Sequence, residues 1–148
     1  MTVDVLTEIV IDRPCDRVAG YAADPSHAPD WYVNIASVRW RTGPPLRLGS
    51  RVAFVARFLG RQLEYTYEVT EYEPGHRLVM RTAEGPFPME TSYTWRPHPS
   101  GGTLMTLRNR GEPAGFARVG APVLAAAMRR TNAKDLARLK VLLEQLPT

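Results

Sequence analysis

Apolar and polar residues alternate along most of the chain, and this alternation predicts β-strands whose two faces differ in polarity. The clearest stretch is 62–73, where every second residue on one face is apolar: Leu63, Tyr65, Tyr67 and Val69. Gly, Pro and Asp residues punctuate the chain between such stretches, as they do in turns. The pattern predicts seven strands, at about 3–11, 35–41, 51–58, 62–73, 77–82, 89–96 and 103–110.

Helical spacing replaces the alternation in two regions. After the first strand, Asp12-Arg13-Pro14 and Asp24-Pro25 are typical helix starts, so we expect two short helices there, the second made irregular by Pro29. Near the end of the chain, residues 117–146 repeat buried-type positions at steps of three and four, which predicts one long helix with a break or kink near Pro122. Its stripe is Leu124, Met128, Asn132, Leu136, Leu139, Leu143 and Leu146.

This order of elements predicts an α+β fold. Only one long helix is available to cover the apolar face of the strands, so we expect a curved seven-stranded antiparallel sheet wrapped around that helix. A single helix leaves part of such a sheet uncovered, and we expect a ligand pocket of roughly 300–1,000 Å³ between them. The inward face of the sheet is predicted to carry Phe54, Phe58, Tyr65, Tyr67, Met80, Met89, Tyr93, Trp95 and Met105.

Size and composition are those of one globular domain. The chain has 148 residues, of which 44% are hydrophobic and 23% are charged. The single cysteine, Cys15, excludes a disulfide framework and a multi-cysteine zinc site. There is no apolar run of about 20 residues and no basic, apolar leader, so we expect no membrane insertion, no secretion signal and a location in a bacterial or otherwise reducing cytoplasm.

The charge of the chain is uneven. The formal net charge is +4, and residues 39–62 hold six arginines and no acidic residue. Such basicity is found in nucleic-acid-binding proteins. Here, however, the arginines alternate with apolar residues on predicted strands, which places them on a solvated outer face opposite glutamates, with Arg57 expected to pair with Glu64 or Glu68. We therefore expect no nucleic-acid partner.

Several short motifs, in their order and spacing, resemble one known family. The chain resembles the START-like "helix-grip" superfamily, also called SRPBCC, and within it the bacterial polyketide cyclase/dehydrase and lipid-transport family. The motifs cover nearly the whole chain; they are Ile11-Asp12-Arg13-Pro14-Cys15-Asp16-Arg17-Val18, Asp24-Pro25, Pro29-Asp30-Trp31, Leu48-Gly49-Ser50, Tyr67-Glu68-Val69-Thr70-Glu71-Tyr72-Glu73-Pro74-Gly75, Gly101-Gly102-Thr103 and Asp135-Leu136-Ala137-Arg138-Leu139-Lys140.

The resemblance implies that residues 1–148 form a single START-like domain with a hydrophobic ligand cavity, and it implies no particular reaction. Inward polar groups such as Thr91, Asn109 and Asn132 would orient a ligand, or else hydrogen-bond to one another. The residues expected to bind the ligand are Trp31, Phe54, Phe58, Tyr65, Tyr67, Met80, Met89, Thr91, Tyr93, Trp95, Met105, Asn109, Leu124, Met128 and Asn132.

No catalytic or metal-binding pattern is evident in the sequence. His27, His76 and His98 each lie in a predicted turn, and no inward-facing histidine or carboxylate is identified. Neither a metal-ligand spacing nor a nucleophile elbow or phosphate loop is present, so we expect no metal and no cofactor. Residues 111–120 read as a connector that could also cover the cavity.

Three functions remain open. The first is binding of a small hydrophobic or amphipathic molecule, lipid- or polyketide-like, by a monomer or homodimer. The second is a polyketide cyclase/dehydratase-type enzyme that positions such a molecule and polarises its carbonyls, with Tyr65, Tyr67, Tyr93 and Asn132 as the acting residues. The third is a regulatory module that binds an acidic protein through the basic face of the last helix, which carries Arg129, Arg130, Lys134 and Arg138.

Overall fold

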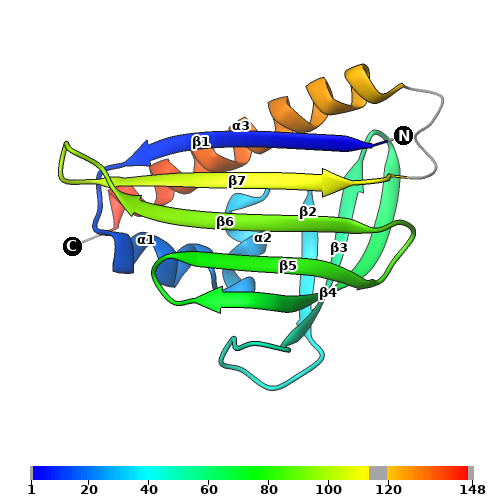
Figure 1. Ribbon diagram of the computed structural model, residues 1–148, viewed down its shortest axis with the longest axis horizontal. Helices are drawn as coiled ribbons and strands as arrows, with labels where there is room; N and C mark the ends of the chain where they lie inside the picture. Colours follow the sequence, from blue (N-terminus) through cyan, green and yellow to red (C-terminus); the bar gives the residue numbers. More distant parts are fainter. Residues whose placement is uncertain (1, 114–119, 147–148) are drawn as a thin grey trace.

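The strands form one curled antiparallel sheet in the computed structural model, which describes residues 2–113 and 120–146 (Figure 1). The order across the sheet is β1-β7-β6-β5-β4-β3-β2, so β1 joins the last strand and the others follow as a meander. The predicted α+β architecture of a seven-stranded sheet and a long C-terminal helix is confirmed. The strands are β1 (Val3–Ile11), β2 (Ile35–Trp40), β3 (Arg51–Phe58), β4 (Arg61–Glu73), β5 (Arg77–Glu84), β6 (Met89–Pro97) and β7 (Thr103–Gly111).

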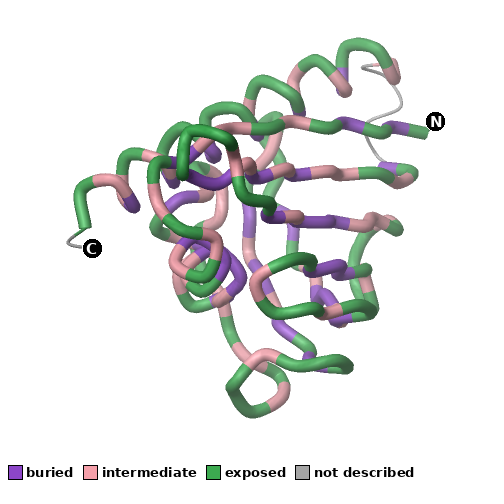
Figure 2. The backbone as a smooth tube through the Cα atoms, turned by 60° about the vertical axis from the view of Figure 1, so that its left-hand side comes forward, coloured by how far each residue is buried: buried purple, intermediate pink, exposed green. Residues whose placement is uncertain are grey.

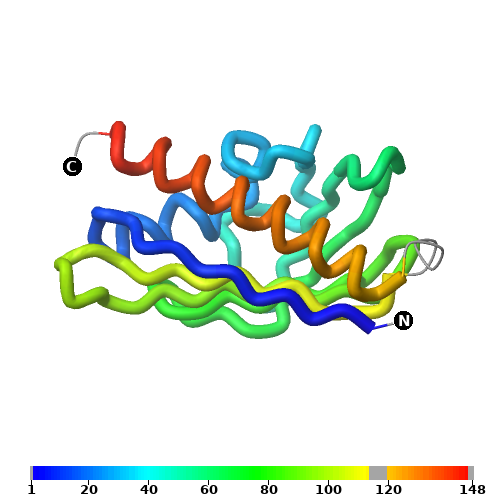
Figure 3. The backbone as a smooth tube through the Cα atoms, turned by 90° about the horizontal axis from the view of Figure 1, so that it is seen from above, coloured from blue at the N-terminus to red at the C-terminus, as the bar shows by residue number. Residues whose placement is uncertain are grey.

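All described helices lie on the same side of the sheet (Figure 3). Helix α1 (Cys15–Ala22) follows β1, and the second short helix is in fact two pieces, a 3₁₀ turn η1 (Pro25–His27) and α2 (Ala28–Trp31). Asp24 caps η1 by accepting a 2.9 Å hydrogen bond from the backbone N–H of Ser26. The long helix α3 (Ala121–Gln145) runs obliquely across the sheet beside β1.

The expectation of a break at Pro122 is wrong. Gly120, with a φ of +86°, precedes α3, and Pro122 lies in its first turn, where a missing N–H costs no helical hydrogen bond. The predicted start of the helix at 117 lies outside the described residues. Leu146 follows the last turn and is exposed, so it does not belong to the buried stripe.

The hairpin between β3 and β4 is displaced by one residue from the predicted Gly60-Arg61 turn. Phe58 pairs with Arg61, and the two residues between them, Leu59 and Gly60, have φ values of 48° and 77°. Positive φ at both positions is the geometry of a type I′ turn, which matches the twist of the strands that it joins. The turn fixes the register of β3 and β4, so that the inward-facing residues of the two strands lie opposite one another, as Phe54 and Tyr65 do.

Buried apolar side chains form two clusters. Buried positions recur along the strands and along α3, separated by more exposed ones (Figure 2). The larger cluster surrounds Trp31 and Trp95, and the smaller one surrounds Leu124 and Met128 at the start of α3. Tyr65 and Met89 pack against both clusters. One cluster therefore covers each end of the inner face of the sheet, and Tyr65 and Met89 lie between the two clusters.

The outer face of the sheet carries ion pairs between neighbouring strands. Glu90 accepts hydrogen bonds from Arg81 at 2.6 Å and from Arg110 at 2.8 Å, and Arg51 pairs with Glu68 at 2.9 Å. The predicted pairing of Arg57 with Glu64 or Glu68 is wrong, because Arg57 stands opposite Gln62 in the register. None of the described helices is both long and apolar enough to cross a membrane.

Candidate functional site

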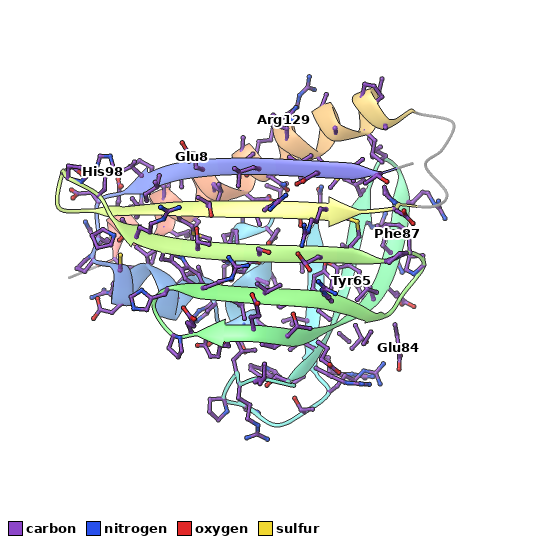
Figure 4. The ribbon with its side chains drawn as sticks, viewed as in Figure 1. Glu8, Tyr65, Glu84, Phe87, His98 and Arg129 are labelled. Atoms are coloured by element: carbon purple, nitrogen blue, oxygen red, sulfur yellow. The ribbon has the colours of Figure 1, made fainter. Side chains whose placement is uncertain are left out.

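A cavity of about 170 Å³ lies between the inner face of the sheet and the first half of α3. It is smaller than the 300–1,000 Å³ expected from the sequence. Its walls are mainly apolar and aromatic, and they come from the end of α1, from η1 and α2, from β2 to β7, from the loop after β5 and from α3. Tyr65 on β4 and Phe87 in the loop between β5 and β6 lie toward the end of the sheet where this loop joins the two strands (Figure 4).

Most of the residues expected to bind a ligand line this cavity. The exceptions are Trp95 and Met105, which are buried but absent from its wall. The expected residues that do line it are Trp31, Phe54, Phe58, Tyr65, Tyr67, Met80, Met89, Thr91, Tyr93, Asn109, Leu124, Met128 and Asn132.

Trp95 and Met105 face inward as predicted, but at the filled end of the sheet. They are direct partners in the register of β6 and β7. Helix α1 packs on β6 there, and both residues belong to the larger apolar cluster together with Val18 of α1 and Leu139 of α3. Their inward faces are covered by side chains of the two helices, and no space remains for a ligand.

A chain of hydrogen bonds crosses one wall of the cavity. The Thr91 hydroxyl donates to Oδ1 of Asn109 at 2.7 Å, and the Tyr67 hydroxyl lies 2.8 Å from the Thr91 oxygen. Because Thr91 has a single hydroxyl proton, Tyr67 is the donor in the second bond. Burial raises the pKa of Tyr67 to about 12, so its hydroxyl remains protonated at neutral pH. Of the two roles expected for the inward polar groups, Thr91 and Asn109 therefore show the second one, because they hydrogen-bond to each other.

A second polar group is formed by tyrosines on facing elements. The hydroxyl of Tyr32, at the end of α2, is hydrogen-bonded to the hydroxyl of Tyr93 on β6. Tyr65 also reaches this region, and its hydroxyl forms no hydrogen bond with a described residue. Burial raises the pKa of all three phenols, first by desolvation and further by neighbouring groups that include Asp135. Each phenol is therefore a neutral donor.

Asn132 offers an unused hydrogen-bond donor. Its side chain is 6% exposed and lines the cavity, and its Nδ2 has no hydrogen-bond partner among the described residues. The indole nitrogen of Trp31, another wall residue, is in the same condition. A buried amide without a partner costs about 1–3 kcal/mol, which makes this position receptive to an acceptor atom.

Asp135 corrects the expectation that no carboxylate faces inward. It lies three residues after Asn132 on the same face of α3, is 1% exposed, and lines the cavity. Its Oδ1 accepts a 2.8 Å hydrogen bond from the backbone N–H of Val33. Desolvation raises the pKa of this carboxyl from 3.8 to about 6, although the Val33 hydrogen bond and the charge of Arg138 act in the opposite direction.

The helical spacing of the sequence indicated that Asp135 faces inward, but its charged side chain suggested a solvent-exposed position. Leu124, Met128 and Asn132 define the inward stripe, and residue 135 continues it by one step of three. Tyr32 was also missed. It follows the last residue of α2, and a helix of four residues is too short for the spacing of its apolar residues to show which side faces inward. Further wall residues that were not anticipated come from loops, helices and strands: Ala22, Ala23, Pro25, Ala28, Asn34, Ile35, Ala56, Arg57, Leu63, Thr82, Pro86, Phe87, Pro113 and Thr131.

The remaining candidate residues do not meet at a common site. His27 stacks on Tyr21 with ring centroids 4.0 Å apart, while His98 hydrogen-bonds to Ser100 in a turn. Cys15 Sγ lies 3.5 Å from the Thr103 hydroxyl, whose proton is donated to the carbonyl oxygen of Arg13. Within residues 2–113 and 120–146, no three His, Cys, Asp or Glu side chains are grouped as metal ligands. Arg129, in the basic set on α3, points away from the sheet (Figure 4).

Three solved structures illustrate what this fold is similar to. A START superfamily protein from Mycobacterium smegmatis aligns with a TM-score of 0.82 at 14% identity, covering 97% of this chain and 99% of its own. Zhui aromatase/cyclase from a Streptomyces species aligns with a TM-score of 0.80 at 17% identity, covering 98% and 95%. A major latex-like protein from Panax ginseng aligns with a TM-score of 0.76 at 16% identity, covering 99% of both chains. At such identities the likeness shows the helix-grip fold.

Sequence comparison identifies the family. Among curated proteins, none matches this sequence at a significant level. A family model described as polyketide cyclase / dehydrase and lipid transport matches residues 2–144, which is nearly the whole chain. The resemblance noted from the turn and helix motifs is thereby confirmed, and the chain belongs to the polyketide cyclase / dehydrase and lipid transport family.

Proposed function

We propose that this protein binds a small, mainly apolar molecule with one polar group in the cavity beneath the first half of α3. The observation that carries the proposal is the buried, unpartnered amide of Asn132 in the wall of an otherwise apolar cavity. A ligand acceptor atom would satisfy this donor; the indole nitrogen of Trp95 is also without a partner, but it lies in the filled part of the core and not in the cavity wall. Family membership and the helix-grip fold are consistent with ligand binding.

The volume limits the size of the ligand. A cavity of 170 Å³ equals the liquid volume of about six water molecules. This suits a single substituted ring or a short alkyl chain in the present conformation. Each Å² of apolar ligand surface that leaves water contributes about 25 cal/mol, so apolar burial supplies most of the affinity and the polar groups select orientation.

Native mass spectrometry of freshly purified protein, followed by denaturing extraction, tests the proposal directly. We expect a complex heavier than the chain and release of a small molecule of defined mass. A cavity-filling variant, Ala56→Leu, adds three carbons at a wall position and should abolish retention. Ala126→Leu adds the same atoms at an exposed position of α3 and should retain the ligand.

Retention that is unchanged in Ala56→Leu would contradict binding in this cavity. If no ligand co-purifies, titration with a fluorescent apolar probe provides the same comparison, because the probe should bind to wild type and Ala126→Leu and not to Ala56→Leu. Equal probe binding by all three proteins would place the binding surface elsewhere and refute the proposal.

A second candidate, a cyclase/dehydratase-type enzyme, is favoured by Asp135. A buried carboxyl beside protonated phenols is a set of groups able to accept and return a proton at a bound carbonyl compound. One similar structure is named an aromatase/cyclase. Incubation with a linear poly-β-ketone tests this: a ring-closed product that disappears in Asp135→Asn would support catalysis, and binding without turnover would refute it.

A further inference from the structure

The carboxylate of Asp135 is buried without a cation. No Lys, Arg or His nitrogen of a described residue lies within 4.0 Å of it, and its hydrogen bond comes from the neutral backbone of Val33. The nearest cationic influence is Arg138, one turn further along α3, whose side chain is exposed. A buried charge without a partner of opposite sign is costly, and a cation brought to it recovers part of that cost.

Aromatic rings surround the same part of the cavity. Trp31 lies 4.1 Å from Tyr32 and 5.9 Å from Tyr93, measured between ring centroids. The charge of Asp135 raises the pKa of Tyr32, Tyr65 and Tyr93, so these hydroxyls lie within reach of its field. The faces of such rings carry negative electrostatic potential and attract ammonium groups.

These two features discriminate between ligand charges. The cavity wall also holds an arginine, Arg57 on β3, which is exposed and forms no ion pair with Asp135. An anionic ligand group beside Asp135 would place a second negative charge there in a region of low dielectric constant. A neutral ligand would leave the carboxylate unpaired. An ammonium group would pair with the carboxylate and lie against the aromatic wall, while the apolar part of the ligand fills the space toward Leu124 and Phe54.

We propose that the ligand is a small organic amine whose ammonium group pairs with Asp135 inside the aromatic wall of the cavity. This inference rests on the proposed binding function and specifies the chemical class of its ligand. This ligand class is narrower than the small hydrophobic or amphipathic, lipid- or polyketide-like molecule expected from the sequence.

Three probes of nearly equal shape test the charge preference: 2-phenylethylamine, 2-phenylethanol and 3-phenylpropionate. Calorimetric titration of wild-type protein at pH 7.5 should give an affinity for the amine at least about tenfold above that for the alcohol, with the carboxylate weakest. In Asp135→Asn, which retains an acceptor for the Val33 N–H, the amine should lose this advantage while alcohol binding changes less than about twofold.

Glu8→Gln is the matched control, because it removes one carboxylate on the exposed side of β1 (Figure 4). The amine preference should persist in this variant. Equal affinities of wild type for amine and alcohol, or a preference that survives in Asp135→Asn, would overturn the inference while leaving the binding function intact. Failure of all three probes to bind would overturn the binding function and the inference with it.

A measurement on the wild type alone covers the case in which Asp135→Asn misfolds. Burial raises the pKa of Asp135 to about 6 and also raises the pKa of the phenols that face it, Tyr32, Tyr65 and Tyr93, so these phenols stay neutral between pH 5 and pH 7.5. The cationic side chains nearby are Arg138 on the next turn of α3 and Arg57 in the cavity wall. Amine affinity should therefore fall about tenfold from pH 7.5 to pH 5, with alcohol affinity unchanged. An amine affinity independent of pH over this range would contradict the pairing.

Discussion

Oδ1 of Asp135 accepts a 2.8 Å hydrogen bond from the backbone N–H of Val33, which joins the middle of α3 to the chain just after α2. The two residues are far apart in sequence, and Asp135 lines the cavity whereas Val33 lies next to the wall residues Tyr32 and Asn34. The bond satisfies a backbone donor where a short helix ends, and it fixes one oxygen of the carboxyl group. The carboxyl group therefore serves the fold and the cavity together.

The raised pKa of Asp135 predicts an unusual pH dependence of stability. Between about pH 4 and pH 6 the folded protein retains a proton on this carboxyl that the unfolded chain has lost, so increasing pH destabilises the fold through this group. The difference in unfolding free energy between wild type and Asp135→Asn should fall by about 2–3 kcal/mol from pH 4 to pH 7.5. Urea denaturation at both pH values measures it, and a difference that is constant or rises with pH would refute the raised pKa.

The hydrogen-bonded chain through Thr91 predicts that the hydroxyl matters more than the methyl group. Thr91→Val keeps the shape but leaves the Tyr67 hydroxyl and the Asn109 carbonyl oxygen unpaired, at a cost of about 1–3 kcal/mol. Thr91→Ser keeps the hydroxyl and should cost about 1 kcal/mol. Thermal unfolding of both variants provides the comparison, and a valine variant as stable as the serine variant would contradict the hydrogen-bonded chain.

The Tyr32–Tyr93 pair predicts non-additive substitutions. Each single change to phenylalanine leaves the other hydroxyl without its partner, so Tyr32→Phe and Tyr93→Phe should each destabilise by about 1–2 kcal/mol. The double variant should be more stable than the sum of the two effects by at least about 0.5 kcal/mol. Denaturant titration of wild type, the two single variants and the double variant measures this double-mutant cycle. Strictly additive changes in unfolding free energy would show that the two hydroxyls do not interact.

Gly102 is required because another strand approaches it closely. A Cβ at this position would lie 2.4 Å from the carbonyl oxygen of Ile11 and 3.2 Å from Cα of Asp12. Gly102→Ala should therefore cost about 1–3 kcal/mol by forcing β1 and β7 apart. Gly43→Ala, with no atom within 4 Å of the added carbon, should stay within about 0.5 kcal/mol of wild type. Equal melting temperatures of the two variants would contradict this account.

The sequence predicted the fold well because the fold depends on local rules. Period-two alternation located β3 and β4 closely, and Asp12-Arg13-Pro14 and Asp24-Pro25 marked the starts of the short helices. The errors concern local detail. The β3–β4 turn shifted to Leu59-Gly60, since the sequence does not show which residues accept positive φ, and Pro122 proved compatible with a first helical turn.

The cavity could be predicted only in part. The sequence shows which strand residues face the helices, but it does not show which of them are covered by helix side chains and which line a cavity. Trp95 and Tyr65 share the inner face of the sheet, yet α1 and α3 cover the first and leave the second at the cavity. Which half is filled depends on how two helices cross a twisted sheet. Asp135 was missed since a charged helical residue is ordinarily solvated, and its burial depends on the long-range bond to Val33.

A crystal structure of the protein grown with 2-phenylethylamine, and a second one grown with 2-phenylethanol, would test the central claim most directly. The account predicts electron density for a ring in the cavity against Phe54 and Tyr65, and an ammonium nitrogen within hydrogen-bond distance of the Asp135 carboxylate. Density only on the outer surface, or a cavity closed by rearranged side chains at saturating ligand, would contradict binding between the sheet and α3.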